Sequence, residues 1–236
     1  MFGSNQPTEF DLRFSLMGIP IRVHPFFWLL TAVLGWDSMR LGPPFLILWV
    51  VICFVSILVH ELGHALVSRW LGCGGQSIEL YGMGGLARFL PTRRLTRTHE
   101  IAIALAGPMA GFILWGLMRF VLGAPLLRWG TVHAIQNGNP QLSMLIEFGV
   151  LYWLHVNLWW GLLNLLPIFP LDGGQVSMAI CRSMNPLRGD LTAHKIGMVV
   201  AGIAAIYFFQ QKQTYSALLF ASLAMNNYQM LERSRY

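Results

Sequence analysis

One short motif, HELGH at His60–His64, carries the clearest chemistry in this chain of 236 residues. On a helix, residues i and i+4 lie on the same face, so both imidazoles can approach one metal ion. Glu61 is turned about 100° from His60, so its carboxylate can reach a water beside the metal instead of the metal itself. Neutral imidazole nitrogen suits zinc, so the motif predicts a zinc site with His60 and His64 as ligands and Glu61 as the catalytic residue.

The motif leaves a third ligand to be found. A further histidine on the same helix is excluded, because Val67 and Trp70 stand where the extended motif requires Gly and His. Asp172 is the best candidate, since it follows a proline-broken segment and precedes glycines that let the backbone bend toward another helix. Glu79 and Glu100 would serve in a different class of membrane zinc protease, and the remaining histidines stay open as ligands.

Composition places this motif in a membrane. Hydrophobic residues make up 55% of the chain and charged residues 11%, against roughly 25% charged in soluble globular chains. So few charges exclude both a disordered chain and a soluble protein of this size. A glutamate and two histidines are costly within a membrane span, so such groups are functional by default. The three cysteines are far apart, which excludes a disulfide scaffold and a closely spaced thiolate zinc site.

Six apolar segments approach the length of about 20 residues that a membrane span needs. We expect an all-α polytopic membrane protein with about six transmembrane helices, near residues 25–41, 45–71, 100–122, 144–166, 196–210 and 215–228. The first segment is short and is interrupted by Asp37 and Arg40. The stretch after HELGH is too rich in glycine for a helix, and residues 77–81 and 86–89 within it predict two short strands.

The distribution of basic residues predicts the orientation. If the N-terminus is cytoplasmic and all six segments cross, the outer side holds Arg40, Arg128 and Lys212. The inner side then holds a much larger set: Arg13, Arg22, Arg69, Arg88, Arg93, Arg94, Arg97, Arg182, Arg188, Lys195, Arg233 and Arg235. Because Lys and Arg accumulate in cytoplasmic loops, we expect both termini in the cytoplasm. The net charge of +6 then reflects membrane topology and not nucleic-acid binding.

HELGH and the later segment NLLPIFPLDGG, residues 164–174, resemble the two signatures of the site-2 protease family of intramembrane zinc metalloproteases. That family carries HExxH on one span and NxxPxxPxxDG, or a close variant, on a later one. Here Leu171 alone separates the last proline from Asp172, a variant common in prokaryotic members. The sequence GPMAG at Gly107–Gly111 is similar to the small-residue motif of the family's intervening helix. The resemblance covers about residues 19 to 180.

The resemblance implies a three-helix catalytic core with a small β-strand region beside it. It also implies one Zn²⁺ per chain, held by His60, His64 and Asp172. The implied activity is cleavage of a substrate's transmembrane segment near the cytoplasmic face of a prokaryotic cell membrane, as in regulated intramembrane proteolysis.

A single integral membrane protease domain is expected to occupy residues 1–236. Its catalytic core would lie at about 19–180, followed by two additional helices at about 196–228. No soluble peptide-binding or regulatory domain is evident in the sequence. The expected partners are therefore a transmembrane protein substrate, the lipid bilayer and a regulatory membrane protein that aids recognition, with no nucleic acid.

Two further features are candidates for substrate contact. Asn164 could donate a hydrogen bond to the substrate backbone or the developing oxyanion, with a role in helix structure as an equal alternative. A helix hides its carbonyl groups in i to i−4 bonds, so the segment to be cleaved has to be extended. The strand region at 80–89, with Gly84, Gly85 and Leu86, could pair with that segment by strand addition; a structural hairpin is the alternative.

The alternative function is an intramembrane metal-ion transporter or channel, in which polar groups within spans bind a passing ion. That function predicts ligands on several spans along a path through the whole membrane. Here the candidate ligands are expected near one face, and Glu61 is poorly placed as a ligand beside its histidine neighbours. A catalytically inactive scaffold is disfavoured by the intact set of His60, Glu61, His64 and Asp172.

Overall fold

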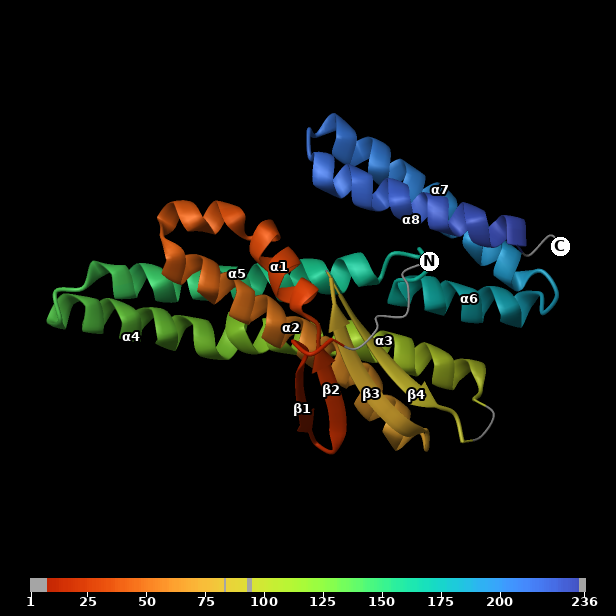
Figure 1. The fold of residues 1–236 in the computed structure, drawn as a ribbon, viewed down its shortest axis with the longest axis horizontal. Helices are drawn as coiled ribbons and strands as arrows, with labels where there is room; N and C mark the ends of the chain where they lie inside the picture. Colours follow the sequence, from red (N-terminus) through yellow and green to blue (C-terminus); the bar gives the residue numbers. More distant parts are fainter. Residues whose placement is uncertain (1–7, 83, 93–94, 234–236) are drawn as a thin grey trace. The chain divides into compact units, whose positions relative to one another are not determined.

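Figure 1 shows the computed structural model, which describes residues 8–82, 84–92 and 95–233. The described residues form two compact units. Of these described residues, the sheet unit contains 8–82, 84–92 and 109–161, and the C-terminal unit contains 95–108 and 162–233. The expectation of a single protease domain over residues 1–236 stays a prediction.

A four-stranded sheet in the order β1-β2-β3-β4 joins two distant parts of the sequence. Its strands are β1 (Leu12–Leu16), β2 (Ile19–Val23), β3 (Gly74–Tyr81) and β4 (Gly84–Leu90). The pairs β1–β2 and β3–β4 are antiparallel, whereas β2 and β3 are parallel. The two strands expected after HELGH are confirmed and are longer than predicted. β1 was not predicted, although its residues Leu12–Leu16 alternate between apolar and polar types.

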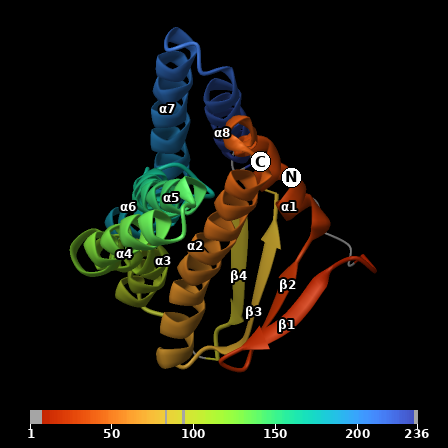
Figure 2. The same cartoon turned by 90° about the vertical axis from the view of Figure 1, so that its left-hand side faces the viewer.

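One face of the sheet packs on helix α2 (Pro43–Trp70), which runs beside β3 and β4 in Figure 2. Along β2, the buried residues alternate with Pro20 and Arg22, the period expected of a half-buried strand. The buried cluster that joins the sheet to α1 and α2 consists of Ile19, Ile21, Val23, Phe27, Ile57, Leu58, Leu62, Ala65, Ile78 and Leu80. This cluster fixes the sheet against the half of α2 that carries HELGH.

The first expected span, residues 25–41, is a short helix followed by a 3-10 turn. Helix α1 (Pro25–Leu34) has ten residues and the turn Trp36–Leu41 has six, so together they extend about 27 Å at the usual rises. Strand β2 leads into α1, and α2 leads back into β3, the neighbour of β2. The chain therefore leaves the sheet along α1 and returns to it along α2.

Four helices in the described part of the chain are long and apolar enough to cross a membrane. They are α2, the continuous helix Arg97–Gln136, α5 (Pro140–Asn164) and α7 (Gly189–Gln210). The continuous helix consists of α3 (Arg97–Leu117), a π-helical turn at Met118–Leu122 and α4 (Gly123–Gln136). The remaining helices are α6 (Asp172–Met184) and α8 (Thr214–Arg233). The expected helical membrane protein with a small strand region is confirmed, and the count of six spans stays a prediction.

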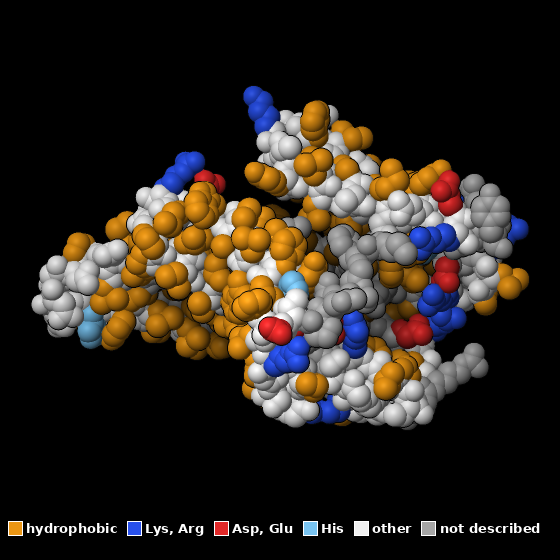
Figure 3. All heavy atoms as spheres, viewed as in Figure 1, with side chains coloured by type: hydrophobic (Ala, Val, Ile, Leu, Met, Phe, Trp, Pro, Cys, Tyr) orange, Lys and Arg blue, Asp and Glu red, His pale blue; other side chains and the backbone are white. Residues whose placement is uncertain are grey.

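Exposed hydrophobic side chains cover much of α4 and α5 in Figure 3. Leu126 and Trp129 on α4 and Leu151 on α5 are examples. Soluble proteins rarely expose contiguous apolar patches of this kind, whereas helices in contact with lipid do. The continuous helix has 40 residues and a contour length of about 60 Å, roughly twice the hydrocarbon thickness of a bilayer, so it is longer than one direct crossing requires.

In the C-terminal unit, α7 and α8 form a helical hairpin against which the segment between α5 and α6 packs (Figure 1). Ile168, in that segment, is fully buried together with Ala201 of α7 and with Phe220 and Leu223 of α8. The packing ties the entrance of α6, where Asp172 lies, to the last two helices of the chain.

Candidate metal centre and catalytic residues

The HELGH motif lies within a single uninterrupted helix. Helix α2 begins at Pro43, where the missing N–H of proline removes no helical hydrogen bond, and it has 28 residues. It ends just before Gly72, which has a positive φ of 83° that favours glycine. The sequence thus places the motif about two to three turns before the end of a long apolar helix.

His60 and His64 come together one turn apart on α2. Their side chains are buried, with 3% and 7% exposed, and their Nε2 atoms lie 3.2 Å apart. On a tetrahedral zinc ion with Zn–N distances of 2.0–2.1 Å, two ligand nitrogens lie about 3.3 Å apart. The imidazole pair therefore already has the spacing that two zinc ligands require.

Glu61 is buried and is held by edge strand β4. Its Oε2 atom accepts a hydrogen bond of 2.9 Å from the main-chain N–H of Ala87. Gly85 passes so close to Glu61 that a Cβ atom there would overlap the carboxylate side chain, whereas the same position at Gly84 is open. The strand therefore orients the carboxylate through its main chain. Ala87 could not be predicted from the sequence, because a main-chain donor leaves no residue-type signal.

Glu79 belongs to an ion-pair network on the other face of the sheet. Arg22 lies 3.1 Å from Glu79 and 3.2 Å from Asp11, and Arg88 lies 3.0 Å from Glu79. Because side chains alternate along a strand, Glu79 points away from the neighbouring residues of β3 that pack on α2. Within the sheet unit, this carboxylate is therefore directed away from HELGH and is neutralised by two arginines.

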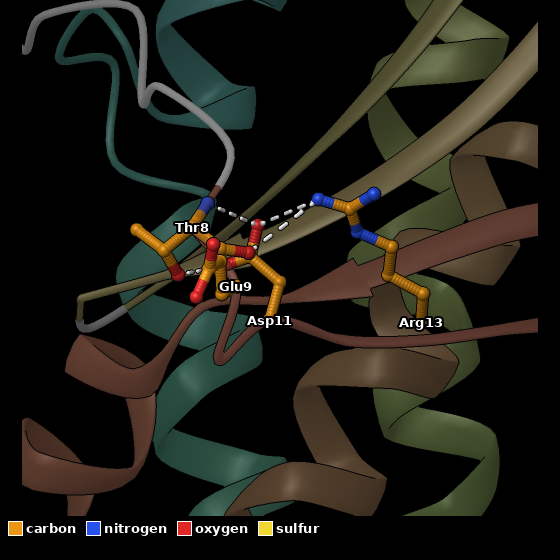
Figure 4. A pocket seen from close by; sticks show the side chains of 4 residues that line it. All are labelled: Thr8, Glu9, Asp11 and Arg13. Atoms are coloured by element: carbon orange, nitrogen blue, oxygen red, sulfur yellow. Dashed lines mark hydrogen bonds and ion pairs between the residues drawn. The ribbon is translucent and has the colours of Figure 1, made fainter.

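A surface pocket at the start of the chain is lined by Thr8, Glu9, Asp11 and Arg13 (Figure 4). Asp11 accepts hydrogen bonds from the main-chain N–H of Thr8 at 3.0 Å and from its hydroxyl at 2.7 Å. Desolvation of the buried carboxylate opposes ionisation, but the Thr8 hydrogen bonds and Arg22 outweigh it and lower the pKa of Asp11 to about 2. The Asp11 carboxylate is therefore already bonded to Thr8 and to Arg22. Through Arg22 it links the residues just before β1 to strand β2.

Asp172 opens helix α6 directly after the proline-containing loop of residues 165–171. Its side chain is buried, with 6% of the residue exposed. A Cβ atom on Gly173 or Gly174 would overlap the main chain of the loop, so the two glycines let the loop fold back on the first turn of α6. The sequence DGG thereby places a buried carboxylate at the start of a helix.

Two other expected residues lie in the same unit as Asp172. Asn164 is the last residue of α5 and is 9% exposed. Glu100 lies in the first turn of α3, where its partly exposed carboxylate is 3.9 Å from Arg97. Asp172 is therefore the more deeply buried of the two carboxylates in this unit that could serve as a ligand.

A buried polar pair on the last two helices was not expected from the sequence. His194 of α7, one of the histidines left open as a ligand, instead forms a hydrogen bond with Asn227 of α8. The adjacent asparagines Asn226 and Asn227 within an expected span are the sequence signal that could have drawn attention to this position. Asn157 of α5 similarly donates to the Ser56 hydroxyl of α2 at 3.0 Å.

The family model that matches this chain is that of peptidase family M50. The match covers residues 48–128 and 124–208, more than half of the chain, and includes both HELGH and Asp172. The chain belongs to peptidase family M50.

Relatives of this M50 chain are named as zinc metalloproteases. A zinc metalloprotease of Methanocaldococcus jannaschii is 32% identical over 197 residues, which are 82% of this chain and 52% of that protein. A putative zinc metalloprotease of Synechocystis sp. is 32% identical over 196 residues, 78% of this chain and 48% of that protein. This chain spans about half the length of these curated relatives.

Among solved structures, the site-2 protease of Methanocaldococcus jannaschii aligns with this M50 chain with a TM-score of 0.59 and 27% identity. The alignment covers 94% of this chain and 95% of that one, which confirms the expected site-2 protease family and fold. At the level of the family, the expected enzyme class, a zinc metalloendopeptidase, and the expected cofactor, zinc, are confirmed as well. His60, His64 and Asp172 each offer one buried ligand atom of a type that zinc accepts.

Proposed function

We propose that this M50 protein is a zinc-dependent intramembrane endopeptidase that cuts a transmembrane segment of a membrane protein near the cytoplasmic face, as in regulated intramembrane proteolysis. One observation carries the proposal: a buried imidazole pair and Glu61 lie within a helix that is long and apolar enough to cross a membrane. Such groups are costly within a bilayer unless they serve a function.

In this proposal, His60, His64 and Asp172 hold one zinc ion per chain. Two imidazoles and a carboxylate, with a fourth position left open, form a ligand set that is common in catalytic zinc sites. When bound, zinc supplies a Lewis acid for the scissile carbonyl and activates the attacking water. The spacing of the two imidazole nitrogens and the burial of all three side chains support this assignment.

Glu79 and Glu100 are less suitable as the third ligand. Glu79 is paired with Arg22 and Arg88 on the sheet face that points away from α2. Glu100 is partly exposed beside Arg97. Either carboxylate would have to leave an arginine partner to bind a metal ion.

Glu61 acts as the general base and then as the general acid. Its carboxylate accepts a proton from the attacking water and passes that proton to the leaving amide nitrogen. A general base has to be oriented so that its carboxylate lies within hydrogen-bond distance of the proton that it accepts. The 2.9 Å hydrogen bond from Ala87 to Oε2 supports this role, because it orients the carboxylate before substrate arrives.

The substrate segment pairs with strand β4 at Gly84, Gly85 and Leu86. β4 is the last strand of the sheet within the described residues, so strand addition would extend the sheet there. An added segment would be extended, with the scissile carbonyl free of helical hydrogen bonds. It would lie close to Glu61, because the main chain of β4 itself contacts that carboxylate.

Asn164 donates a hydrogen bond to the substrate main chain or to the developing oxyanion in the same proposal. Its support is its place at the end of α5, buried, immediately before the loop that leads to Asp172.

The active site is proposed to lie near the cytoplasmic face, with both termini in the cytoplasm of a prokaryotic cell. Because β1 and β2 share a sheet with β3 and β4, the N-terminal strands and the segment after α2 belong to one side of the membrane. Arg13, Arg69 and Arg88 lie on that side, which is typical of the cytoplasmic face. His64 lies about 9 Å along the helix from Trp70, so water could reach it from that side.

Cysteine labelling on a background without Cys53, Cys73 and Cys181 tests this orientation. We expect Ser15→Cys and Thr96→Cys to react only with a reagent applied from the cytoplasmic side. Gln213→Cys, between α7 and α8, should react only from outside. Labelling of Thr96→Cys from outside alone would contradict the proposed topology.

The proposed substrate is a transmembrane protein, recognised in the lipid bilayer through the spans and strand β4. A regulatory membrane protein would aid this recognition. Nucleic acid has no part in this function, since the basic residues follow the membrane topology.

The direct test of the activity uses the purified protein in liposomes with a single-span substrate. We expect mass spectrometry to find products cut within the transmembrane segment, after zinc is restored to chelator-treated protein and not before. The same liposomes report zinc uptake, which separates the alternative function. Zinc uptake with no cut peptide bond would favour the metal-ion transporter and contradict the protease.

A further inference from the structure

Helices α7 and α8 hold the loop that leads to Asp172 through side chains with no part in the proposed reaction. Asn227 of α8 is fully buried. Its Nδ2 atom donates a hydrogen bond of 2.7 Å to the main-chain oxygen of Phe169, in the loop, and one of 2.9 Å to that of Leu223. Its Oδ1 atom lies 3.1 Å from Nδ1 of His194 on α7. One amide therefore joins the loop to both helices.

The hydrogen bonds of Asn227 allow one orientation of its amide. A carbonyl oxygen can only accept, so the atom that faces the carbonyls of Phe169 and Leu223 has to be the NH₂ group. The amide oxygen then faces His194, whose Nδ1 atom has to carry a hydrogen and donate it. Both N–H groups and the oxygen of this buried amide have partners. A fully bonded buried network of this kind favours a single arrangement of the groups that it joins.

Two apolar contacts fix the same loop. The ring of Phe169 packs edge-on against His194, with ring centroids 5.5 Å apart and ring planes at 86°. Ile168, the preceding residue, is fully buried with Ala201 and Phe220. Ile168 and Phe169, which are neighbours in the loop, are therefore both held by these last two helices.

Gly197 of α7 leaves the space that this arrangement needs. A Cβ atom at Gly197 would lie 2.7 Å from Oδ1 of Asn227 and 3.3 Å from the main-chain oxygen of Pro167. The amide cannot move aside without losing its bonds to His194 and Phe169. Gly202, on the same helix, has open space at its Cβ position.

We propose that Asn227 and His194 are positioning residues for Asp172, which keep the loop of residues 165–171 in the conformation that zinc binding requires. The inference rests on the proposed role of Asp172 as a zinc ligand. Phe169, which accepts the hydrogen bond from Asn227, is separated from Asp172 only by Pro170 and Leu171. A shift of the loop at Phe169 therefore moves the carboxylate of Asp172 as well. Groups that support a metal ligand typically change metal affinity or activity by 10- to 100-fold when they are removed.

The two glycines of α7 provide a matched pair of variants. Gly197→Ala and Gly202→Ala make the same change in helix propensity, but only Gly197→Ala crowds Asn227. We expect Gly197→Ala to lower zinc affinity about 10- to 100-fold and to lower kcat with little change in KM. Gly202→Ala should match the wild type. Zinc affinity is measured by competition with a chromophoric chelator, which requires no cleavage.

A second pair changes the amide itself. Asn227→Asp keeps the size of the side chain but replaces the donor that faces two carbonyls by an acceptor, so we expect the same loss of zinc affinity. Asn226→Asp makes the same chemical change on the adjacent, partly buried residue and should have no such effect. Circular dichroism and thermal unfolding report whether each variant is folded. If Asn227→Asp does not fold, the glycine pair decides the question.

Asp172→Ala supplies the reference for both pairs. Zinc affinity that falls in Asp172→Ala, Gly197→Ala and Asn227→Asp, but in neither control, supports the positioning role. A fall in Asp172→Ala with wild-type affinity and kcat in folded Gly197→Ala and Asn227→Asp would overturn the positioning role alone. An equal fall in the controls would also overturn it, because the effect would then be general. Wild-type zinc affinity in Asp172→Ala would overturn the proposed ligand, and the positioning role with it.

Discussion

The two units hold their parts of the proposed site by different means. In the sheet unit, His60, Glu61 and His64 share one helix, and the i, i+4 spacing puts both imidazoles on one face, where their nitrogens lie 3.2 Å apart. In the C-terminal unit, Asp172 follows a loop whose conformation depends on side chains of α7 and α8, such as Asn227. The helical pair is thus fixed by local structure, and the carboxylate by contacts distant in sequence. Changes far from the site should therefore affect Asp172 more than the histidines.

The largest effect is expected for removal of a ligand from the helical pair. His60→Ala should lose both zinc and cleavage, because a site with two remaining ligands holds zinc weakly. Zinc per chain by atomic emission and cleavage of a single-span substrate measure the two losses. His133→Ala, on α4, is the matched control and should retain both. Full zinc content in His60→Ala would contradict the assignment of the pair.

A smaller effect is expected when strand β4 is forced away from the base. Gly85→Ala introduces a Cβ atom that overlaps Glu61, so the carboxylate has to move while His60 and His64 stay in place. We expect kcat to fall by about 10²-fold, the usual consequence of misplacing a catalytic group by about 1 Å, with zinc content unchanged. Gly116→Ala, on α3, adds the same atom in open space away from the proposed substrate strand and should retain activity. Equal kcat in the two variants would contradict the conclusion that strand β4 orients the Glu61 carboxylate.

The smallest effect concerns the stability of the sheet. Although burial opposes its ionisation, Asp11 has a pKa lowered to about 2 by Thr8 and Arg22, against roughly 3.9 in an unfolded chain. A lowered pKa adds stability that is complete above about pH 4 and is lost as the pH falls through about 2. We expect Asp11→Asn to lower Tm slightly at pH 5 to 7, and the difference from wild type to shrink between pH 4 and pH 2.

Thermal unfolding across that range measures the effect, with Asp37→Asn as the control because the Asp37 side chain is 90% exposed. Asp37→Asn should leave Tm close to the wild-type value at every pH. A difference between wild type and Asp11→Asn that grows below pH 4 would contradict the assigned direction of the pKa shift.

The features that sequence could predict are those set by neighbouring residues. HELGH required only helical periodicity, and the apolar runs required only the thickness of a bilayer. The strands β3 and β4 could be predicted from glycines that exclude a helix. In the same way, the run of prolines and glycines around Asp172 signalled a break in the chain at that point.

The features that sequence could not predict depend on residues far apart in the chain. Strand β2, just before the first expected span, belongs to the sheet only because it pairs with β3, more than fifty positions later. The N–H group of Ala87 contacts Glu61 through the main chain, which any residue except proline could provide. Asn227 serves the loop at Phe169 only because α8 packs beside it. None of these pairings leaves a local pattern of residue types.

The central claim, that Glu61 is the proton-transferring residue of a zinc endopeptidase, is tested most directly by Glu61→Gln. Glutamine has nearly the same shape but cannot accept and deliver the proton, so we expect zinc content and fold to be retained while cleavage falls by at least 10²- to 10⁴-fold. The measurement is cleavage of a single-span substrate in liposomes, with bound zinc determined on the same samples. Cleavage by zinc-loaded Glu61→Gln at the wild-type rate would contradict the mechanism.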